Sequence, residues 1–276
     1  MVCSQILVGW RSSLLRNLFT SLFRNSKSYL DLKFLESIQT EPLSQTCYVI
    51  WYYFEKNKKI QLKYLNEPFR YIFRFDNKYH ISGTDIWRAE NQIKWFKTNL
   101  VIQFNDKNLW DDIRIKFTNF RSLETNKKTD IYNTYFTYCL SKDTFKKSVK
   151  SYNSVVQIPN KIIYLPKRYR HLKGGVAYGY LKDNEIISFA AAPHILNKKS
   201  FSYAIIRGME TRLVERRQGF AYETISKLCE ALFNEVNINS IFLWVEENNL
   251  AAIYLYEKLG FLKDSVIYAT YCDLHA

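Results

Sequence analysis

The sequence predicts an α/β fold with a mixed sheet for residues 174–276, preceded by a second α+β domain. Strand-like apolar runs alternate with helical stripes in this region. A basic turn with one glycine stands between one such run and the longest stripe. The charge also changes: residues 174–276 hold ten of the 40 Lys and Arg and twelve of the 26 Asp and Glu, giving −2, and the remainder, 30 against 14, carries +16. A boundary near residues 150–173 is therefore expected.

The first 30 residues are predicted to form a basic amphipathic segment. They contain Arg11, Arg16, Arg24 and Lys27, have no acidic residue before Asp31, and carry a helical stripe of leucine and phenylalanine. This composition is typical of a mitochondrial transit peptide, and it also fits an ordinary first helix packed on the domain.

Cysteine usage and hydropathy bear on the compartment. The five cysteines are scattered and have no metal-ligand spacing, which indicates a reducing compartment and no zinc site. No apolar run is long enough for a transmembrane helix, so no membrane partner is expected. We therefore expect a cytoplasmic protein, with a mitochondrial location as the alternative.

Residues 31–160 are predicted to form a basic α+β domain whose role the sequence does not reveal. Aromatic and β-branched runs separated by polar turns predict an antiparallel meander. Thr84 and Asp85 predict the start of a helix. The predicted strands are 47–54, 60–64, 70–75 and 100–104, and the predicted helices are 86–98, 109–113 (helix or turn) and 143–149. Residues 162–165 lie between two prolines and are predicted to be a linker or an edge strand.

The predicted binding element follows an apolar strand that runs from Tyr203 to Thr211. After it come Arg216, Arg217 and Gly219, and then a helical stripe. The stripe consists of Ile225, Leu228, Cys229, Leu232, Phe233 and Val236. The first amides of a helix lack internal partners, the helix dipole favours negative charge there, and a glycine allows a ligand to approach closely. This stretch is therefore predicted to hold a phosphate or pyrophosphate.

Two motifs resemble those of the GNAT superfamily of N-acetyltransferases. Arg216-x-x-Gly219-x-Ala221 is similar to the family's acetyl-CoA pyrophosphate loop, Q/R-x-x-G-x-G/A. A second motif, after a predicted strand at 241–245, resembles N-x-x-A-x-x-L-Y-x-x-L-G-F. Its matching residues are Asn249, Ala252, Leu255, Tyr256, Leu259, Gly260 and Phe261. The resemblance covers about residues 174–276, and the runs 174–181 and 185–190 are similar to the family's preceding hairpin.

The resemblance implies an enzyme that transfers an acetyl or other acyl group from acyl-CoA to an amine in a ternary complex. Acetyl-CoA would be the co-substrate, and no metal is expected. The donor would bind the loop and pair with the strand edge before it. It would also contact Asn249, which is expected to cap the second helix. The implied donor contacts are Leu213, Val214, Arg216, Arg217, Gln218, Gly219, Phe220, Ala221 and Asn249. In two-domain members the first half is often a diverged copy of the same fold.

The resemblance also implies catalytic residues. Tyr256 matches a tyrosine that lies near the thioester sulfur in many members and protonates the leaving thiolate. A lysine-like amine is almost wholly protonated at neutral pH, so a base would help. Glu210, at the end of the predicted strand, is the expected base; the alternative is a surface carboxylate paired with Arg207 or Arg212. His194 titrates in a suitable range, although a solvated loop histidine is the simpler interpretation.

Other function classes stay open at this point. The sequence has no P-loop motif, no G-x-S-x-G and no H-E-x-x-H. One alternative is an acyl-CoA-binding module without catalysis. The other is a nucleic-acid-associated protein whose basic first half binds the phosphate backbone. The acceptor amine, on a small molecule or a protein, is not identified by the sequence, and the basic first half favours an anionic one.

Overall fold

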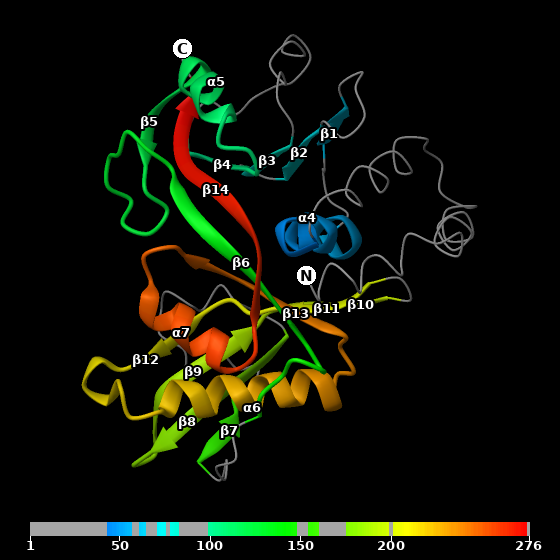
Figure 1. The fold of residues 1–276 in the computed structure, drawn as a ribbon, viewed down its shortest axis with the longest axis vertical. Helices are drawn as coiled ribbons and strands as arrows, with labels where there is room; N and C mark the ends of the chain where they lie inside the picture. Colours follow the sequence, from blue (N-terminus) through cyan, green and yellow to red (C-terminus); the bar gives the residue numbers. More distant parts are fainter. Residues whose placement is uncertain are drawn as a thin grey trace. The chain divides into compact units, whose positions relative to one another are not determined.

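The computed structural model describes residues 43–56, 61–64, 71–75, 78–82, 99–147, 154–159, 175–198 and 201–274 (Figure 1). Contacts divide the chain into two compact units. The first unit contains residues 1–137, 246–248 and 264–276, and the second contains 138–245 and 249–263. The predicted segment 1–30, the predicted helix 86–98 and residues 162–165 lie outside the described residues. The predicted division at residues 30, 160 and 174 stays a prediction, because those positions are also outside them.

Among its described residues, the first unit combines a sheet with two helices. Its strands follow the order β1-β2-β3-β4-β14-β6, and β5 pairs with β14. Strands β3 and β4 are parallel, whereas β14 runs antiparallel to β4 and to β5. Helix α5 packs against β5. The elements are α4 (Leu43–Lys56), β1 (Gln61–Tyr64), β2 (Tyr71–Phe75), β3 (Lys78–Ser82), β4 (Leu100–Phe104), α5 (Leu109–Lys116), β5 (Phe117–Arg121), the first part of β6 (Asn133–Ser141) and most of β14 (Leu262–Leu274).

Helix α4 corrects the strand predicted at 47–54. Cys47, Ile50 and Trp51 are spaced as on a helix and are all buried, and Ser44 in the first turn bonds Thr137 at 2.8 Å. The prediction was wrong because a short apolar run that is buried on several sides looks the same in a helix as in a strand. The strands predicted at 60–64, 70–75 and 100–104 are confirmed as β1, β2 and β4. Of the two alternatives predicted at 109–113, a short helix or a turn, the structure shows the helix, α5.

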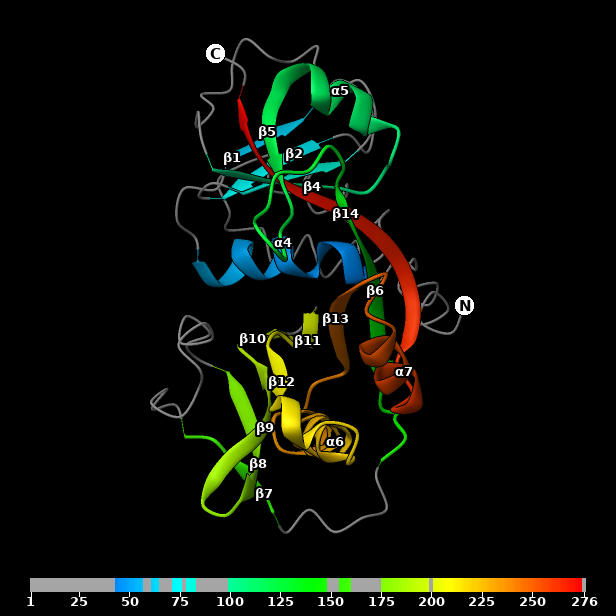
Figure 2. The same ribbon diagram turned by 90° about the vertical axis from the view of Figure 1, so that its left-hand side faces the viewer.

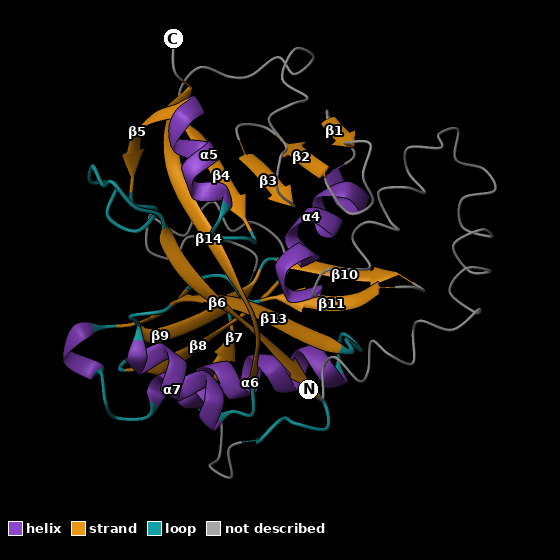
Figure 3. Ribbon diagram, turned by 45° about the horizontal axis from the view of Figure 1, so that its top comes forward, coloured by secondary structure: helices purple, strands orange, loops and turns teal. Residues whose placement is uncertain are grey.

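The described residues of the second unit contain strands of two sheets and two α-helices. In one sheet β6, β13, β11 and β10 are neighbours in that order, and the separate second sheet has the order β12-β9-β8-β7. Helix α6 packs on β8 and β9, as Figure 2 and Figure 3 show. The elements are β7 (Val155–Gln157), β8 (Val176–Lys182), β9 (Glu185–Ala192), β10 (His194–Lys198), β11 (Phe201–Ile205), β12 (Met209–Thr211), the 3-10 helix η5 (Leu213–Glu215), α6 (Phe220–Asn234), β13 (Ser240–Glu246) and α7 (Leu250–Lys258).

The helical stripe predicted after Gly219 lies in the core of the second unit except for its last residue, Val236, which lies beyond the end of α6 and is half-buried. Ile225, Leu228, Cys229 and Leu232 are fully buried in α6, and Phe233 is nearly so. Burial raises the pKa of the Cys229 thiol, so this cysteine is a packing residue. The predicted hairpin is confirmed as β8 and β9, and the predicted strand at 241–245 as β13. The mixed α/β architecture predicted from the sequence is therefore confirmed.

Residues 143–147 do not form the helix predicted at 143–149. Residues 142–144 make a turn and 145–147 are irregular. The amide of Lys146 donates to the carbonyl of Leu259 at 2.9 Å, beyond the end of α7. The prediction was wrong because this backbone takes a tertiary partner in place of the bonds within a helix. Among the described residues no helix combines the length and the apolar character needed to span a bilayer.

Candidate functional site

The predicted central strand is two strands that belong to different sheets. Strand β11 runs parallel to β13 as far as Ile205 beside Phe242, and the amide of Ile206 donates to Phe242 at 2.9 Å. The next residues change partner: Arg207 donates to the carbonyl of Ala191 at 2.8 Å, and β12 then pairs with β9. The chain therefore leaves β13 after Ile206. The prediction of one strand from 203 to 211 was wrong because a pattern of apolar residues does not reveal which neighbour a strand bonds.

The loop between β12 and α6 ends in two left-handed residues. Arg217 has a φ of 63°, and Gly219 has a φ of 92° and is the residue that precedes helix α6. The amide of Glu223 makes the bond to the carbonyl of Gly219, at 3.1 Å. The amides of the first helical turn before Glu223 have no acceptor within the helix. The predicted helix start at a basic glycine turn is thus confirmed.

Gly219 borders open space. A Cβ atom added there would meet no other atom within 4 Å, and the left-handed backbone disfavours any residue that has one. Arg216 and Arg217 are exposed, and within the described part of the chain neither forms an ion pair. The Nε atom of Arg216 donates to the carbonyl of Thr211 at 3.1 Å. Positive charge, unpaired helix amides and open space fit an anionic group such as a pyrophosphate.

Leu213 and Val214 do not lie on a strand edge. Both belong to η5, with exposed fractions of 75% and 83%. The amide of Glu215 donates to Arg212 at 2.9 Å, which closes the backbone into a turn. The expected strand edge at these two residues is therefore wrong in its geometry, although both remain within the loop.

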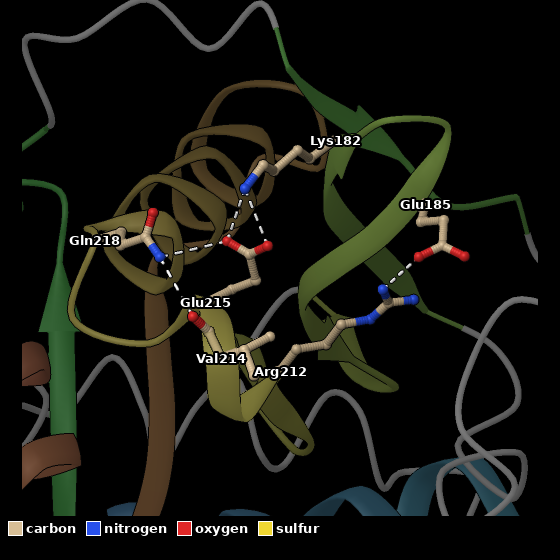
Figure 4. Close-up of polar contacts among 6 residues, drawn as sticks. All are labelled: Lys182, Glu185, Arg212, Val214, Glu215 and Gln218. Atoms are coloured by element: carbon tan, nitrogen blue, oxygen red, sulfur yellow. Dashed lines mark hydrogen bonds and ion pairs between the residues drawn. The ribbon is translucent and has the colours of Figure 1, made fainter.

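A group of charged and polar side chains fastens the loop to the β8–β9 hairpin, as Figure 4 shows. The ammonium of Lys182 is 3.0 Å from each carboxylate oxygen of Glu215. Gln218 donates to the same carboxylate and to the carbonyl of Val214, both at 3.4 Å. Arg212 pairs with Glu185. Sequence reasoning missed Lys182 and Glu215 because they are 33 positions apart and only the fold brings them together.

The second motif forms α7 and the turn after it. Asn249 caps the helix, as predicted: its side chain accepts a bond from the amide of Ala252 at 3.3 Å. Tyr256 is 8% exposed, and its ring meets that of Phe261 edge to face at a centroid distance of 5.7 Å. Tyr254, two positions earlier, is 70% exposed. The motif register therefore selects the buried tyrosine of the pair.

Tyr138 is a buried tyrosine that sequence reasoning did not single out. It lies on β6, and its hydroxyl donates to the carboxylate of Glu257 on α7 at 2.9 Å. Burial, followed by this hydrogen bond, raises the pKa of Tyr138. The phenol therefore stays a donor, and it helps to hold α7 against the strand.

The two candidate bases lie on different strands. Glu210 is in β12 opposite Phe189 of β9, and it is half-buried. Its neighbour Thr211 points to the other face, where it bonds Ser188 at 2.8 Å. His194 is the first residue of β10 and not part of a loop, which corrects its predicted position. Among the described residues no group of His, Cys, Asp and Glu side chains is arranged to hold a metal ion.

Comparisons with known proteins agree with this fold. The model of the Acetyltransferase (GNAT) family matches residues 140–261. A solved structure of a Drosophila protein superimposes with a TM-score of 0.58 at 11% identity, covering 85% of this chain and 89% of that one. A GCN5-related N-acetyltransferase from Kribbella flavida has a TM-score of 0.51 at 10% identity, covering 83% and 95%. No curated protein matches the chain.

The two structural matches are too distant in sequence to show more than a shared fold. The family match is independent of them and includes both motifs, the loop at Arg216–Ala221 and α7 with its turn. The chain therefore contains an acetyltransferase domain of the GNAT family at residues 140–261.

Proposed function

We propose that this protein transfers an acetyl group, or a related acyl group, from acyl-CoA to an amine acceptor. The observation that carries the proposal is the start of α6, where left-handed Gly219 borders open space beside two arginines without ion pairs among the described residues. The family match supports acyl transfer in general, and the donor and the mechanism are our inference.

The donor is held mainly through its pyrophosphate. The amides of Phe220 and Ala221 lie at the positive end of the α6 dipole and bind the pyrophosphate. The guanidinium groups of Arg216 and Arg217 add positive charge. Gln218 shapes the loop through its bonds to Val214 and Glu215. Leu213 and Val214 remain proposed contacts because they lie within the loop, and Asn249 remains one because it lies at the start of α7.

The separation of strands β11 and β13 supports a binding path for the pantetheine part of the donor. Strand β11 stops pairing with β13 after Ile206 and Phe242. The backbone of β13 from Leu243 onward therefore does not pair with β12, which bonds β9 instead. A backbone edge where neighbouring strands separate can bond an extended amide-bearing chain such as pantetheine.

The proposed chemistry is one acyl transfer. The amine nitrogen attacks the thioester carbonyl carbon, the new C–N bond forms, and the C–S bond breaks. Tyr256 donates its phenolic proton to the departing thiolate, and the proton lost by the amine passes to a base, directly or through water. Glu210 is the proposed base. The phenolate then regains a proton from solvent and Glu210 releases the one it accepted, so atoms and charge balance over the cycle.

Titration calorimetry with acetyl-CoA tests donor binding. The wild-type chain is expected to bind in the micromolar range, and Gly219→Glu is expected to abolish binding because it places a carboxylate in the open space where the pyrophosphate would lie. Asn126→Glu is the matched control, since Asn126 is an exposed residue with a φ of 55° in the first unit.

The outcomes separate the alternatives. Failure of the folded wild-type chain to bind any acyl-CoA would show that the proposal is wrong. Binding without free thiol release on any amine would leave an acyl-CoA-binding module. Release of CoA in the presence of amines supports the transferase, and the acceptor is then sought among small-molecule and protein amines, beginning with anionic ones.

A further inference from the structure

We infer that Lys182 is a positioning residue for acyl-CoA, because it neutralises the one carboxylate inside the loop that receives the pyrophosphate. This inference rests on the proposed function. Lys182 ends β8, on the hairpin that faces the loop, and its ammonium bonds both oxygens of the Glu215 carboxylate at 3.0 Å (Figure 4). Neither residue belongs to the two family motifs.

Glu215 is needed for the shape of the loop. Its carboxylate accepts a bond from the Gln218 amide, which also reaches the carbonyl of Val214, at 3.4 Å each. These bonds tie η5 to the residue just before Gly219. The loop between Arg212 and Gly219 is otherwise exposed and makes few buried contacts, so local polar bonds determine its conformation.

The same carboxylate has the wrong charge for the ligand. Glu215 stands four positions before Gly219, and its side chain is only 16% exposed, so water screens its charge poorly. An acyl-CoA pyrophosphate adjacent to it would be repelled. Arg212 does not cancel this charge, because it pairs with Glu185 on the same hairpin. Lys182 supplies the opposite charge and leaves Arg216 and Arg217 available to the ligand.

Lys182 also lies over an aromatic ring at the start of α6. Its ammonium lies 5.9 Å from the ring centroid of Phe220, the first residue of α6, and the Tyr180 ring lies 4.5 Å from the same ring. The hairpin therefore supports both the carboxylate in the loop and the residue whose amide is proposed to bind the donor. A change at Lys182 should therefore act on the end of the donor that carries the pyrophosphate.

The first measurement compares acetyl-CoA affinity in single variants. Lys182→Met is expected to raise the Kd by about fivefold, the upper end for a partly exposed ion pair, while Lys182→Arg stays near the wild-type value. Glu185→Gln is the control, because it breaks the other ion pair between the same hairpin and the same loop without leaving an unpaired acid there. An equal loss in Glu185→Gln would show that hairpin docking, and not charge, matters.

The decisive measurement removes the unpaired acid. The double variant Lys182→Met/Glu215→Gln is expected to regain affinity to within about twofold of wild type, because charge repulsion is gone. The Lys182→Met defect is also expected to vanish with S-acetyl-pantetheine, which has no pyrophosphate. Absence of rescue in the double variant, or an equal defect with the truncated donor, would overturn the inference.

Failure of the inference is distinguishable from failure of the proposed function. If the wild-type chain binds no acyl-CoA, the proposed function is wrong. If the wild type binds acetyl-CoA and Lys182→Met binds it equally well, only the role of Lys182 is wrong. Circular dichroism of each variant confirms that the comparison is made on folded protein.

Discussion

Tyr254 and Tyr256 have opposite environments although they stand two positions apart on α7. Successive residues of a helix point about 100° apart, so side chains at this spacing cannot share a face. Tyr256 is 8% exposed and packed on Phe261, and Tyr254 is 70% exposed. The buried tyrosine has a fixed orientation, as a proton donor to a thiolate requires, and the exposed tyrosine provides a natural internal control.

The two proposed proton-transfer residues should differ in their pH behaviour. Tyr256→Phe is expected to lower kcat by about 100-fold with little change in KM for acetyl-CoA, because only the leaving thiolate loses its proton donor. Glu210→Gln is expected to lower kcat/KM most near neutral pH. Its defect should shrink as the pH rises toward about 10, where a lysine-like amine deprotonates without help.

Steady-state kinetics over a range of pH, with free thiol as the readout, measures both effects. Tyr254→Phe serves as the control and should leave every constant unchanged. A Glu210→Gln defect that is the same at all pH values would mean that Glu210 shapes the site and does not accept the proton.

At the scale of elements, α7 is held at both ends. Asn249 caps its first turn, and the turn after its last residue packs against the segment that follows β6. Gly260 has a φ of 95°, and a Cβ there would lie 1.8 Å from the carbonyl oxygen of Thr144. The glycine of the second motif is therefore required by packing, which also fixes the helix that carries Tyr256.

Gly260→Ala is expected to lower the free energy of unfolding by about 3 kcal/mol, because left-handed strain adds to the clash with Thr144. Gly219→Ala is the matched control: it has a similar φ of 92° and open space around it, so only strain of about 1 kcal/mol is expected. Urea denaturation measures both. Equal losses in the two variants would show that the contact with Thr144 contributes nothing.

At the scale of the whole molecule, the excess positive charge lies outside the region that carries the proposed donor site. The chain carries a net charge of +14, yet residues 174–276 carry ten basic and twelve acidic residues, a net of −2. A region without excess positive charge does not attract an anionic donor through its overall field. The attraction we propose is therefore local, at Arg216, Arg217 and the start of α6.

Donor binding should stabilise the folded chain as a whole. A ligand that binds only the native state contributes about 2.7 kcal/mol at one hundred times its Kd. For a chain of this size we expect acetyl-CoA to raise the melting temperature by about 5–10 °C. Thermal denaturation with and without the ligand measures this shift. Gly219→Glu should show no shift, and an equal shift in that variant would place the binding site elsewhere.

The sequence alone determined the elements whose signal is local. The stripe of α6 repeats with helical period, Asn249 caps the helix that follows it, and a glycine turn precedes α6, because each depends on residues a few positions apart. Both motifs could be aligned with a family for the same reason. The glycine turn and the two helices that carry the candidate donor site were therefore predictable from one continuous stretch of sequence.

Only the tertiary structure decided which distant groups meet. It made residues 43–56 a helix where an apolar run also suited a strand, and it moved the chain from β13 to β9 after Ile206. It also brought Lys182 to Glu215 across 33 positions. Partner choice of this kind depends on backbone bonds and charges between segments far apart in the chain, and no pattern of spacing along one segment records it.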